Sequence, residues 1–401
     1  MVGVLRPPSR RRNWLALVYE RSSGREEHSM VSYRLVGRSG LRVHPLSLGT
    51  MTFGTRWGWG ADRDTARQIF EAYVERGGNL IDTAVNYTDG ESECMVGELI
   101  APRREQLILS TKYTLSRRPD DANSGGNHRL NMIRSVETSL RQLATDRIDL
   151  LYVHAWDFTT SPEEVMRGLD DLVRSGKVVY VGISNTPAWR IAQMQTLADL
   201  RGWTPLIALQ VEYSLVQRTA EHELIPMAAE LGLGIMPWSP LGGGVLTGKY
   251  TEEHLDHEAS DSATGTRPGV IASSGNMTQR ALGIADIVRS IATEVDATPA
   301  QVALAWVLQQ PATTSPIIGA RTLSQAVQNL EALDITLGDD HVARLSAASD
   351  PGAIFPAKFL ARPMTRKLIF GETEIDFNRP TQRQPLSDIV VGGRYAEHGA
   401  R

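Results

Sequence analysis

The sequence has a single cysteine, Cys94, among its 401 residues. A disulfide within the chain needs two cysteines, and a cysteine-based metal cluster needs more, so both are excluded. Histidine spacings typical of zinc sites, such as His-Glu-x-x-His, are also missing, and we predict no metal. One cysteine in a chain of this length is typical of a protein that works in the reducing cytoplasm.

Long apolar runs, excess charge and lysine are scarce as well. No run approaches the roughly 18 apolar residues that a membrane helix needs, so we expect no membrane partner. A net charge of −4 provides no basic footprint for nucleic acid. The 42 cationic residues include only five lysines, so 37 are arginines. A lysine that closes a strand is therefore less expected by chance than an arginine.

The two ends of the sequence do not resemble a folded domain. Residues 1–29 are rich in arginine and hold one short apolar stretch, which is too short for the export signal that Arg11-Arg12 loosely resembles. We expect a disordered extension, or translation that begins at Met30. Residues 351–401 are polar with interspersed proline and arginine, which predicts a partly ordered C-terminal tail. The folded domain is predicted to span 30–350.

Eight apolar runs alternate with helix-like segments inside that domain, after a β-hairpin predicted near 33–43. The runs lie near 46–49, 79–82, 107–111, 148–153, 178–183, 206–211, 233–237 and 315–318. They are apolar throughout, as is typical of parallel strands covered by helices. In one intervening segment, Ile133, Val136, Leu140 and Leu143 share a helical face. The pattern predicts an α/β fold, a (β/α)8 TIM barrel with long loops at its C-terminal face, and a doubly wound open sheet is the alternative.

The last connection, 241–314, is too long for one helix. We expect a loop rich in glycine and serine, 242–276, and helices near 278–294 and 299–309. Gly243 with Gly248-Lys249 nearly matches a phosphate-binding P-loop. However, Tyr250 stands where that motif needs a serine or threonine for magnesium, which argues against nucleotide hydrolysis.

Residues suited to proton transfer follow three of these strands. Asp82 closes one run with Tyr87 five residues on, Lys112 follows the next, and His154 the one after. The C-terminal strand ends of a barrel meet on one face, where active sites lie. A lysine ammonium stabilises a phenolate and lowers the tyrosine pKa from its usual value near 10. Asp82 can hold Lys112 by an ion pair, and His154 can orient a carbonyl oxygen. Taken singly, each side chain could equally be a turn cap, a solvated strand end or a core imidazole.

The order of these motifs resembles the aldo-keto reductase family, NADPH-dependent (β/α)8 oxidoreductases, and within it the aryl-alcohol dehydrogenase-like bacterial and fungal members. The resemblance covers about 33–335 and also rests on Gly182-Ile183-Ser184-Asn185, Gln210-Val211-Glu212-Tyr213, Trp238-Ser239-Pro240-Leu241, Leu246-Thr247-Gly248-Lys249-Tyr250 and Pro316-Ile317-Ile318-Gly319-Ala320-Arg321. It implies a catalytic tetrad of Asp82, Tyr87, Lys112 and His154, with Tyr87 as the general acid.

The same resemblance implies where NADPH binds. The implied contacts are Gly49, Thr50, Met51, Asp82, Ser184, Asn185, Gln210, Trp238, Ser239, Pro240, Leu241, Gly243, Lys249, Gly319, Arg321, Gln325 and Asn329. Ser184, Asn185 and Gln210 would hold the nicotinamide carboxamide, and Trp238 would stack on its ring. Arg321 suits a 2′-phosphate, because a guanidinium pairs well with phosphate oxygens, and this favours NADPH over NADH.

The predicted substrate is a small-molecule carbonyl compound. Trp57, Trp59 and Trp156 follow strand ends and, with Tyr87 and His154, would form aromatic walls suited to an aryl aldehyde. Within the family, a histidine at position 154 favours reduction of a carbonyl over that of a carbon–carbon double bond. The alternative is a redox-sensing regulatory barrel with little turnover, similar to potassium-channel β subunits. The sequence does not indicate the oligomeric state, the physiological substrate or the preferred direction.

Overall fold

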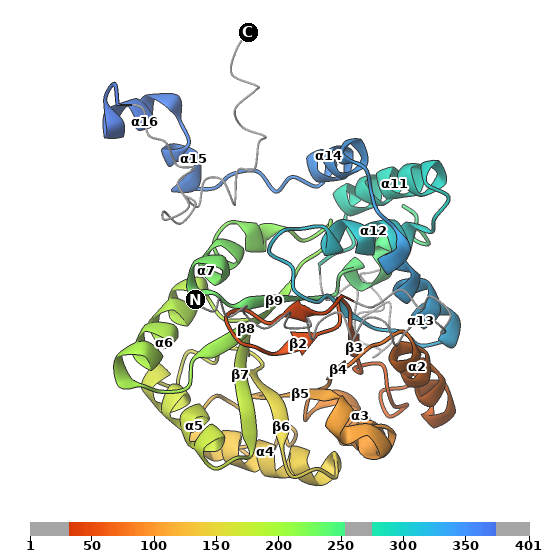
Figure 1. Cartoon of the computed structure of the whole chain (residues 1–401), viewed down its shortest axis with the longest axis vertical. Coiled ribbons are helices and arrows are strands. Elements are labelled where there is room, and N and C mark those ends of the chain that lie inside the picture. The colour runs from red at the N-terminus through yellow and green to blue at the C-terminus, as the bar shows by residue number, and fades with distance from the viewer. Residues whose placement is uncertain (1–31, 253–274, 374–401) are drawn as a thin grey trace, which may run out of the picture. The chain divides into compact units, whose positions relative to one another are not determined.

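Eight parallel strands form one sheet in the computed structural model, which describes residues 32–252 and 275–373. In sheet order they are β10 (Ile317–Ile318), β3 (Ser47–Gly49), β4 (Leu80–Asp82), β5 (Ile108–Tyr113), β6 (Ile148–Val153), β7 (Val178–Ser184), β8 (Leu206–Glu212) and β9 (Gly234–Trp238). The two edges meet where Ile235 of β9 pairs with Thr313 and accepts a 2.8 Å bond from the Thr314 amide. The sheet is thus a nearly closed barrel, which confirms the TIM-barrel prediction and excludes the open sheet (Figure 1).

Helices lie between the strands and around the barrel (Figure 1). Their bounds are α2 Arg63–Glu75, α3 Glu91–Ile100, α4 Arg129–Gln142, α5 Pro162–Arg174, α6 Ala188–Arg201, α7 Leu224–Leu231, α11 Gln279–Glu294, α12 Pro299–Leu308, α13 Leu323–Leu330, α14 Asp339–Ala348, α15 Ala357–Leu360 and α16 Pro363–Phe370. Several of these helices begin at a residue whose side chain accepts a hydrogen bond from the first turn. Thr298 and Gln301 form a reciprocal capping box at the start of α12. The helices expected near 278–294 and 299–309 correspond to α11 and α12.

Helix α4 buries most of the face that apolar spacing predicts, since Val136 and Leu143 are each 1% exposed and Leu140 packs against the core, but one member of that face is not covered. Ile133, expected on the covered side, is 40% exposed. Beside Met132 and Val136, the helix buries the polar residues Asn131, Ser135 and Ser139. Asn131 donates at 2.8 Å to the Gly126 carbonyl in the loop before the helix. Hydrogen bonding to this loop, rather than apolar packing alone, therefore sets the orientation of α4.

An antiparallel hairpin closes the N-terminal end of the barrel. It consists of β1 (Arg34–Leu35) and β2 (Arg42–Val43), as the sequence predicted. Val36 and Val43 belong to a buried cluster with inward-facing residues of the barrel strands. At the tip, the Arg38 amide donates to the Gly232 carbonyl just before β9. Gly37 has φ 55°, and a Cβ there would lie 2.4 Å from that same oxygen, so only glycine fits.

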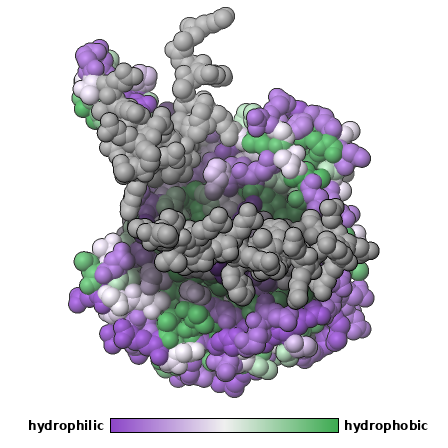
Figure 2. Space-filling model, in the orientation of Figure 1, coloured by the Kyte–Doolittle hydropathy of each residue, from purple (hydrophilic) through white to green (hydrophobic). Residues whose placement is uncertain are grey.

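The longer connections gather at the opposite end, after the C-terminal ends of the strands. They include residues 50–62 after β3, 114–128 after β5 and the connection between β9 and α11, of which 253–274 lie outside the described residues. Figure 2 shows hydrophilic residues over much of the visible described surface, with apolar patches between them. Among the described residues, no helix combines the length and apolarity needed to span a membrane, and no three His, Cys, Asp or Glu side chains are grouped to bind a metal ion.

Candidate active site

Lys112 lies at the centre of a polar cluster at the C-terminal end of the barrel. It is 0% exposed, on the inside of β5. Its ammonium donates to Asp82 Oδ2 at 2.6 Å, to the Thr83 carbonyl at 2.7 Å and to Tyr87 Oη at 3.2 Å. Burial lowers the pKa of Lys112, but the Asp82 carboxylate and Tyr87 more than offset this, so the pKa is raised. A charged ammonium is thereby held within reach of the phenol.

Asp82, the last residue of β4, is fixed by both carboxylate oxygens. Oδ2 binds Lys112, while Oδ1 accepts from Ser110 Oγ at 2.8 Å and from Gln210 Nε2 at 3.0 Å. These partners come from β5 and β8, so strands on different sides of the barrel converge on one carboxylate. A buried carboxylate with this many donors is held in a single orientation.

Tyr87 lies on the short helix η1 (Tyr87–Gly90) that leads into α3. The backbone after it is constrained, because Thr88 and Asp89 have φ values of 45° and 55°. Burial raises the pKa of the Tyr87 hydroxyl and Asp82 raises it further, while the Lys112 ammonium lowers it without cancelling these effects. Lys112 lowers the pKa of Tyr87, as expected from the sequence, but the net shift of this pKa is upward. The hydroxyl therefore holds its proton at neutral pH.

His154, directly after β6, lies beside the tyrosine. The two rings meet edge to face, with centroids 5.9 Å apart. Burial and the charge of Lys112 lower the pKa of His154 to about 3, so the imidazole is neutral at physiological pH. Its Nδ1 is buried without a hydrogen-bond partner among the described residues. The structure thus brings together all four side chains of the predicted tetrad.

The ends of β7, β8 and β9 place the predicted nicotinamide-binding residues side by side. Ser184 of β7 and Gln210 of β8 are paired in register, and Ser184 Oγ is buried without a described partner. Asn185 Nδ2 donates to the His154 carbonyl at 2.9 Å, and its Oδ1 accepts from Trp238 Nε1 at 3.3 Å. Asn185 therefore links the histidine to the tryptophan that closes β9.

A glycine-rich turn follows β9. Gly242, Gly243 and Gly244 all have positive φ, at 56°, 68° and 104°, inside the helix η4 (Gly242–Thr247). The Gly243 amide donates to Ser239 Oγ at 2.9 Å. Of the other predicted contacts here, Pro240 is buried, Leu241 packs partly against the core, and Lys249 is exposed over the Tyr250 ring.

The predicted adenosine-binding residues gather between β10 and α13. The Arg321 amide donates to Gln325 Oε1 at 2.9 Å, and Asn329 Nδ2 donates to the Gly319 carbonyl at 3.2 Å. Arg321 Nε is buried without a described partner. The end of the adjacent strand β3 is nearby, where Gly49 and Thr50 are buried and Met51 is exposed.

The three predicted substrate tryptophans are placed differently. Trp57 and Trp59 lie together in the loop after β3, with ring centroids 6.0 Å apart. Trp156 is only 6% exposed and belongs to the main apolar core, with the Arg190 guanidinium 5.1 Å from its ring. Trp57 and Trp59 therefore have more surface to offer a ligand than Trp156 has.

Ser110 and Glu93 lie in or beside the polar cluster around Lys112 but were not among the site residues predicted from the sequence. Ser110 helps to fix Asp82, but a serine inside an apolar strand carries no distinct signal. Glu93 of α3 is fully buried and accepts from Thr111 Oγ1 at 2.6 Å, next to Lys112 on β5. Burial raises the pKa of Glu93 to about 7. The signal that could have identified Glu93 is its position on the same covered face of α3 as Met95 and Val96.

Comparison with known proteins agrees with this arrangement. The family model described as Aldo/keto reductase family matches residues 45–350. A norsolorinic acid reductase of Aspergillus flavus is 36% identical over 342 residues, 83% of this chain and 84% of that protein. An aryl-alcohol dehydrogenase [NADP(+)] of Phanerodontia chrysosporium is 36% identical over 77% of this chain and 83% of its own. A putative aryl-alcohol dehydrogenase of Saccharomyces cerevisiae is 34% identical over 82% and 90%, respectively. The chain therefore belongs to the aldo/keto reductase family.

Proposed function

We propose that this protein is an NADPH-dependent reductase that converts an aldehyde or ketone, most favourably an aryl carbonyl compound, to the alcohol. The observation that carries the proposal is the Lys112 ammonium, bonded at once to the Asp82 carboxylate and the Tyr87 hydroxyl. The names of the relatives support the same chemistry, since they describe reductases and aryl-alcohol dehydrogenases, one of them with NADP(+).

The four side chains divide the chemistry between them. Tyr87 gives its proton to the carbonyl oxygen, and the Lys112 ammonium stabilises the phenolate that remains. Asp82 holds the ammonium in place, and its carboxylate is itself fixed by the hydrogen bonds that it accepts from Ser110 and Gln210. His154, neutral because its pKa is depressed to about 3, donates a hydrogen bond that orients the carbonyl without adding charge.

The residues present fit a nicotinamide dinucleotide. Ser184 Oγ and Arg321 Nε are buried polar atoms without partners among the described residues. Ser184 ends β7 and Arg321 follows β10, with β8 and β9 between them around the barrel. Ser184, Asn185 and Gln210 would hold a carboxamide, Trp238 would stack on the ring, and Ser239 with the glycine turn would face the diphosphate. Arg321, Gln325 and Asn329 would hold the adenosine and its 2′-phosphate. When bound, NADPH supplies the hydride to the carbonyl carbon.

Steady-state reduction of 4-nitrobenzaldehyde by the full chain, followed by NADPH absorbance, tests the proposal. In Tyr87→Phe, kcat should fall by about 10²–10⁴-fold, because the ring stays and only the acid is lost. NADPH affinity, measured by fluorescence titration, should be nearly unchanged.

Tyr33→Phe is the matched control, since that hydroxyl bonds to the Gly77 carbonyl near the closed end of the barrel. It should keep full activity. Full activity in Tyr87→Phe would contradict the acid assignment. Tight NADPH binding with negligible turnover across aromatic and aliphatic carbonyls would instead favour the redox-sensing alternative.

A further inference from the structure

Residues 354–370, here called the C-terminal arm, follow the matched family domain and expose an unusual amount of apolar surface. Eight large apolar side chains of this segment are exposed, with Phe355, Met364 and Leu368 the most exposed at 80%, 70% and 77%. Thr365 is the one residue of the arm that is buried. Figure 2 shows apolar and hydrophilic residues side by side on the segment that Figure 1 labels α15 and α16.

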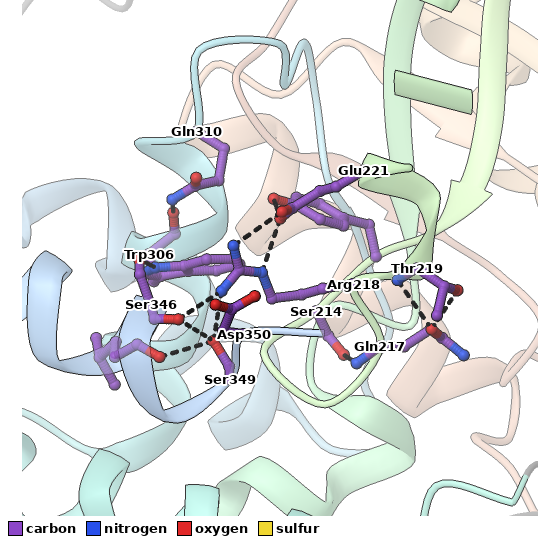
Figure 3. Close-up of polar contacts among 12 residues, drawn as sticks. Ser214, Gln217, Arg218, Thr219, Glu221, Trp306, Gln310, Ser346, Ser349 and Asp350 are labelled. Carbon is purple, nitrogen blue, oxygen red and sulfur yellow. Dashed lines mark hydrogen bonds and ion pairs between the residues drawn. The ribbon is translucent and has the colours of Figure 1, made fainter. Parts of the chain in front are cut away.

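The base of the arm is firmly attached to the barrel. Arg218, in the loop after β8, donates to Glu221 through Nε and Nη2 at 2.7 and 2.8 Å. Its Nη1 donates to the Ser346 carbonyl at 2.7 Å and to Ser349 Oγ at 2.9 Å, at the end of α14 (Figure 3). The Trp306 ring lies 5.1 Å from the guanidinium and closes the cluster. The chain is therefore fixed at residue 349, shortly before the arm begins at residue 354.

The arm itself is too short and too exposed to be stable alone. Its helices α15 and α16 have four and eight residues. Isolated helices shorter than roughly 12–15 residues are marginal in water and depend on packing against another surface. Apolar side chains exposed at this density usually mark an interaction site. A partner surface is therefore needed to hold the arm in its helical form.

The charge of the arm indicates the nature of that surface. Lys358, Arg362, Arg366 and Lys367 lie within it, and it contains no acidic residue, although Lys367 forms an ion pair at 2.8 Å with Glu372 just beyond it. The whole chain has a net charge of −4, so everything outside the arm sums to −8. A second copy of this chain thus has a formal net charge opposite in sign to that of the arm.

We infer that the C-terminal arm is a dimerisation element that packs against a second copy of the chain. The exposed fractions of its apolar side chains correspond to roughly 900 Å² on one arm. A stable interface buries about 800 Å² per partner, and each copy can supply this from part of its arm together with the surface that receives the other arm. In a two-fold dimer each arm contacts the other copy in the same way, which buries both. This inference does not depend on the proposed activity.

Analytical ultracentrifugation of the full chain at micromolar concentrations tests the inference. The wild type should sediment at twice the 44.1 kDa of one chain. Met364→Glu with Leu368→Glu puts four charges into the two-fold interface and should raise the dimer dissociation constant by about 100-fold or more. Leu200→Glu on α6 is the matched control, because Leu200 is also 77% exposed. It should remain dimeric, and circular dichroism should show all variants folded.

Three outcomes would overturn the inference. The first is a wild type that is monomeric at 50 μM, a concentration at which an interface of about this area is normally formed. The second is a dimer that is unaffected by the arm substitutions. The third is a monomer whose arm has another occupant: a lipid surface, shown by arm-dependent binding to phosphatidylcholine–phosphatidylserine vesicles, or its own barrel mouth, shown by a raised KM in the arm variant.

Discussion

Replacement of Lys112 by methionine tests two contributions of the buried lysine, one to the stability of the fold and one to catalysis. The ammonium makes three hydrogen bonds and is fully buried. Methionine fills a similar volume but leaves the Asp82 carboxylate buried without its counter-charge. Breaking a buried ion pair from one side costs about 3–5 kcal/mol, mainly because the remaining charge is unpaired. Ser110 and Gln210 still donate to Asp82, so the lower part of this range applies.

A second substitution, Asp82→Asn, should rescue the stability. The asparagine keeps the shape and removes the stranded charge, so Asp82→Asn with Lys112→Met should be more stable than Lys112→Met alone, by about 2 kcal/mol or more. Activity should not return, because no ammonium is left to stabilise the Tyr87 phenolate. Urea unfolding of the four proteins in the cycle gives the coupling energy, and steady-state kinetics gives the activity.

Additive stability losses would contradict the coupling between Asp82 and Lys112. If the stability loss of the double variant equalled the sum of the losses in the two single variants, Asp82 and Lys112 would not be coupled. Their 2.6 Å contact would then contribute no interaction free energy. Recovery of activity in the double variant would show that the lysine acts only by neutralising Asp82. Partial loss of activity in Asp82→Asn alone, with Lys112 retained, is expected because the ammonium loses its main anchor.

Three further predictions concern Arg321, Glu93 and His154. Arg321→Ala should raise the dissociation constant of NADPH by roughly 10–100-fold and that of NADH far less, by fluorescence titration; equal losses would contradict the 2′-phosphate assignment. Glu93 has a folded pKa raised to about 7, so its contribution to stability is present at low pH and is lost as pH rises from about 4.5 to 7. Urea unfolding should therefore show Glu93→Gln gaining stability relative to wild type by up to roughly 3 kcal/mol between pH 5 and pH 8, and a pH-independent difference would contradict burial as the cause. Burial and Lys112 lower the pKa of His154 to about 3, so protonation of this residue should leave kcat/KM for 4-nitrobenzaldehyde flat between pH 5 and 7. An inflection near pH 6.5 that disappears in His154→Gln would contradict the neutral imidazole.

Much of the barrel could be predicted because its strands are continuously apolar and end in distinctive residues. All eight predicted runs coincide with strands, and the tetrad meets because the strands are parallel. The shortest strand shows where the pattern is weaker. The run at 315–318 yields only Ile317–Ile318, since Pro316 lacks an amide proton and Ser315 makes side-chain bonds to Ser47 and His44 instead.

Buried polar residues account for what periodicity did not reveal. Ile133 looked like a core position, yet α4 turns Asn131 inward because backbone carbonyls there accept its hydrogen bonds. Glu93 is buried although acidic side chains are usually exposed, because the Thr111 hydroxyl donates a hydrogen bond to its carboxylate. In both cases the deciding partner lies in another part of the chain, and hydropathy at one position carries no information about it. The predicted extension 1–29 and the tail beyond 373 lie outside the described residues.

The hairpin that seals the base of the barrel has a practical consequence for handling the protein. Its strands β1 and β2 lie at the end opposite the tetrad, and the described chain enters there at Ser32. A linker fused directly ahead of Ser32 would therefore emerge on the side remote from the tetrad. Attachment to a solid support through such a linker should leave the catalytic end facing the bulk liquid, which is the geometry wanted for a flow reactor.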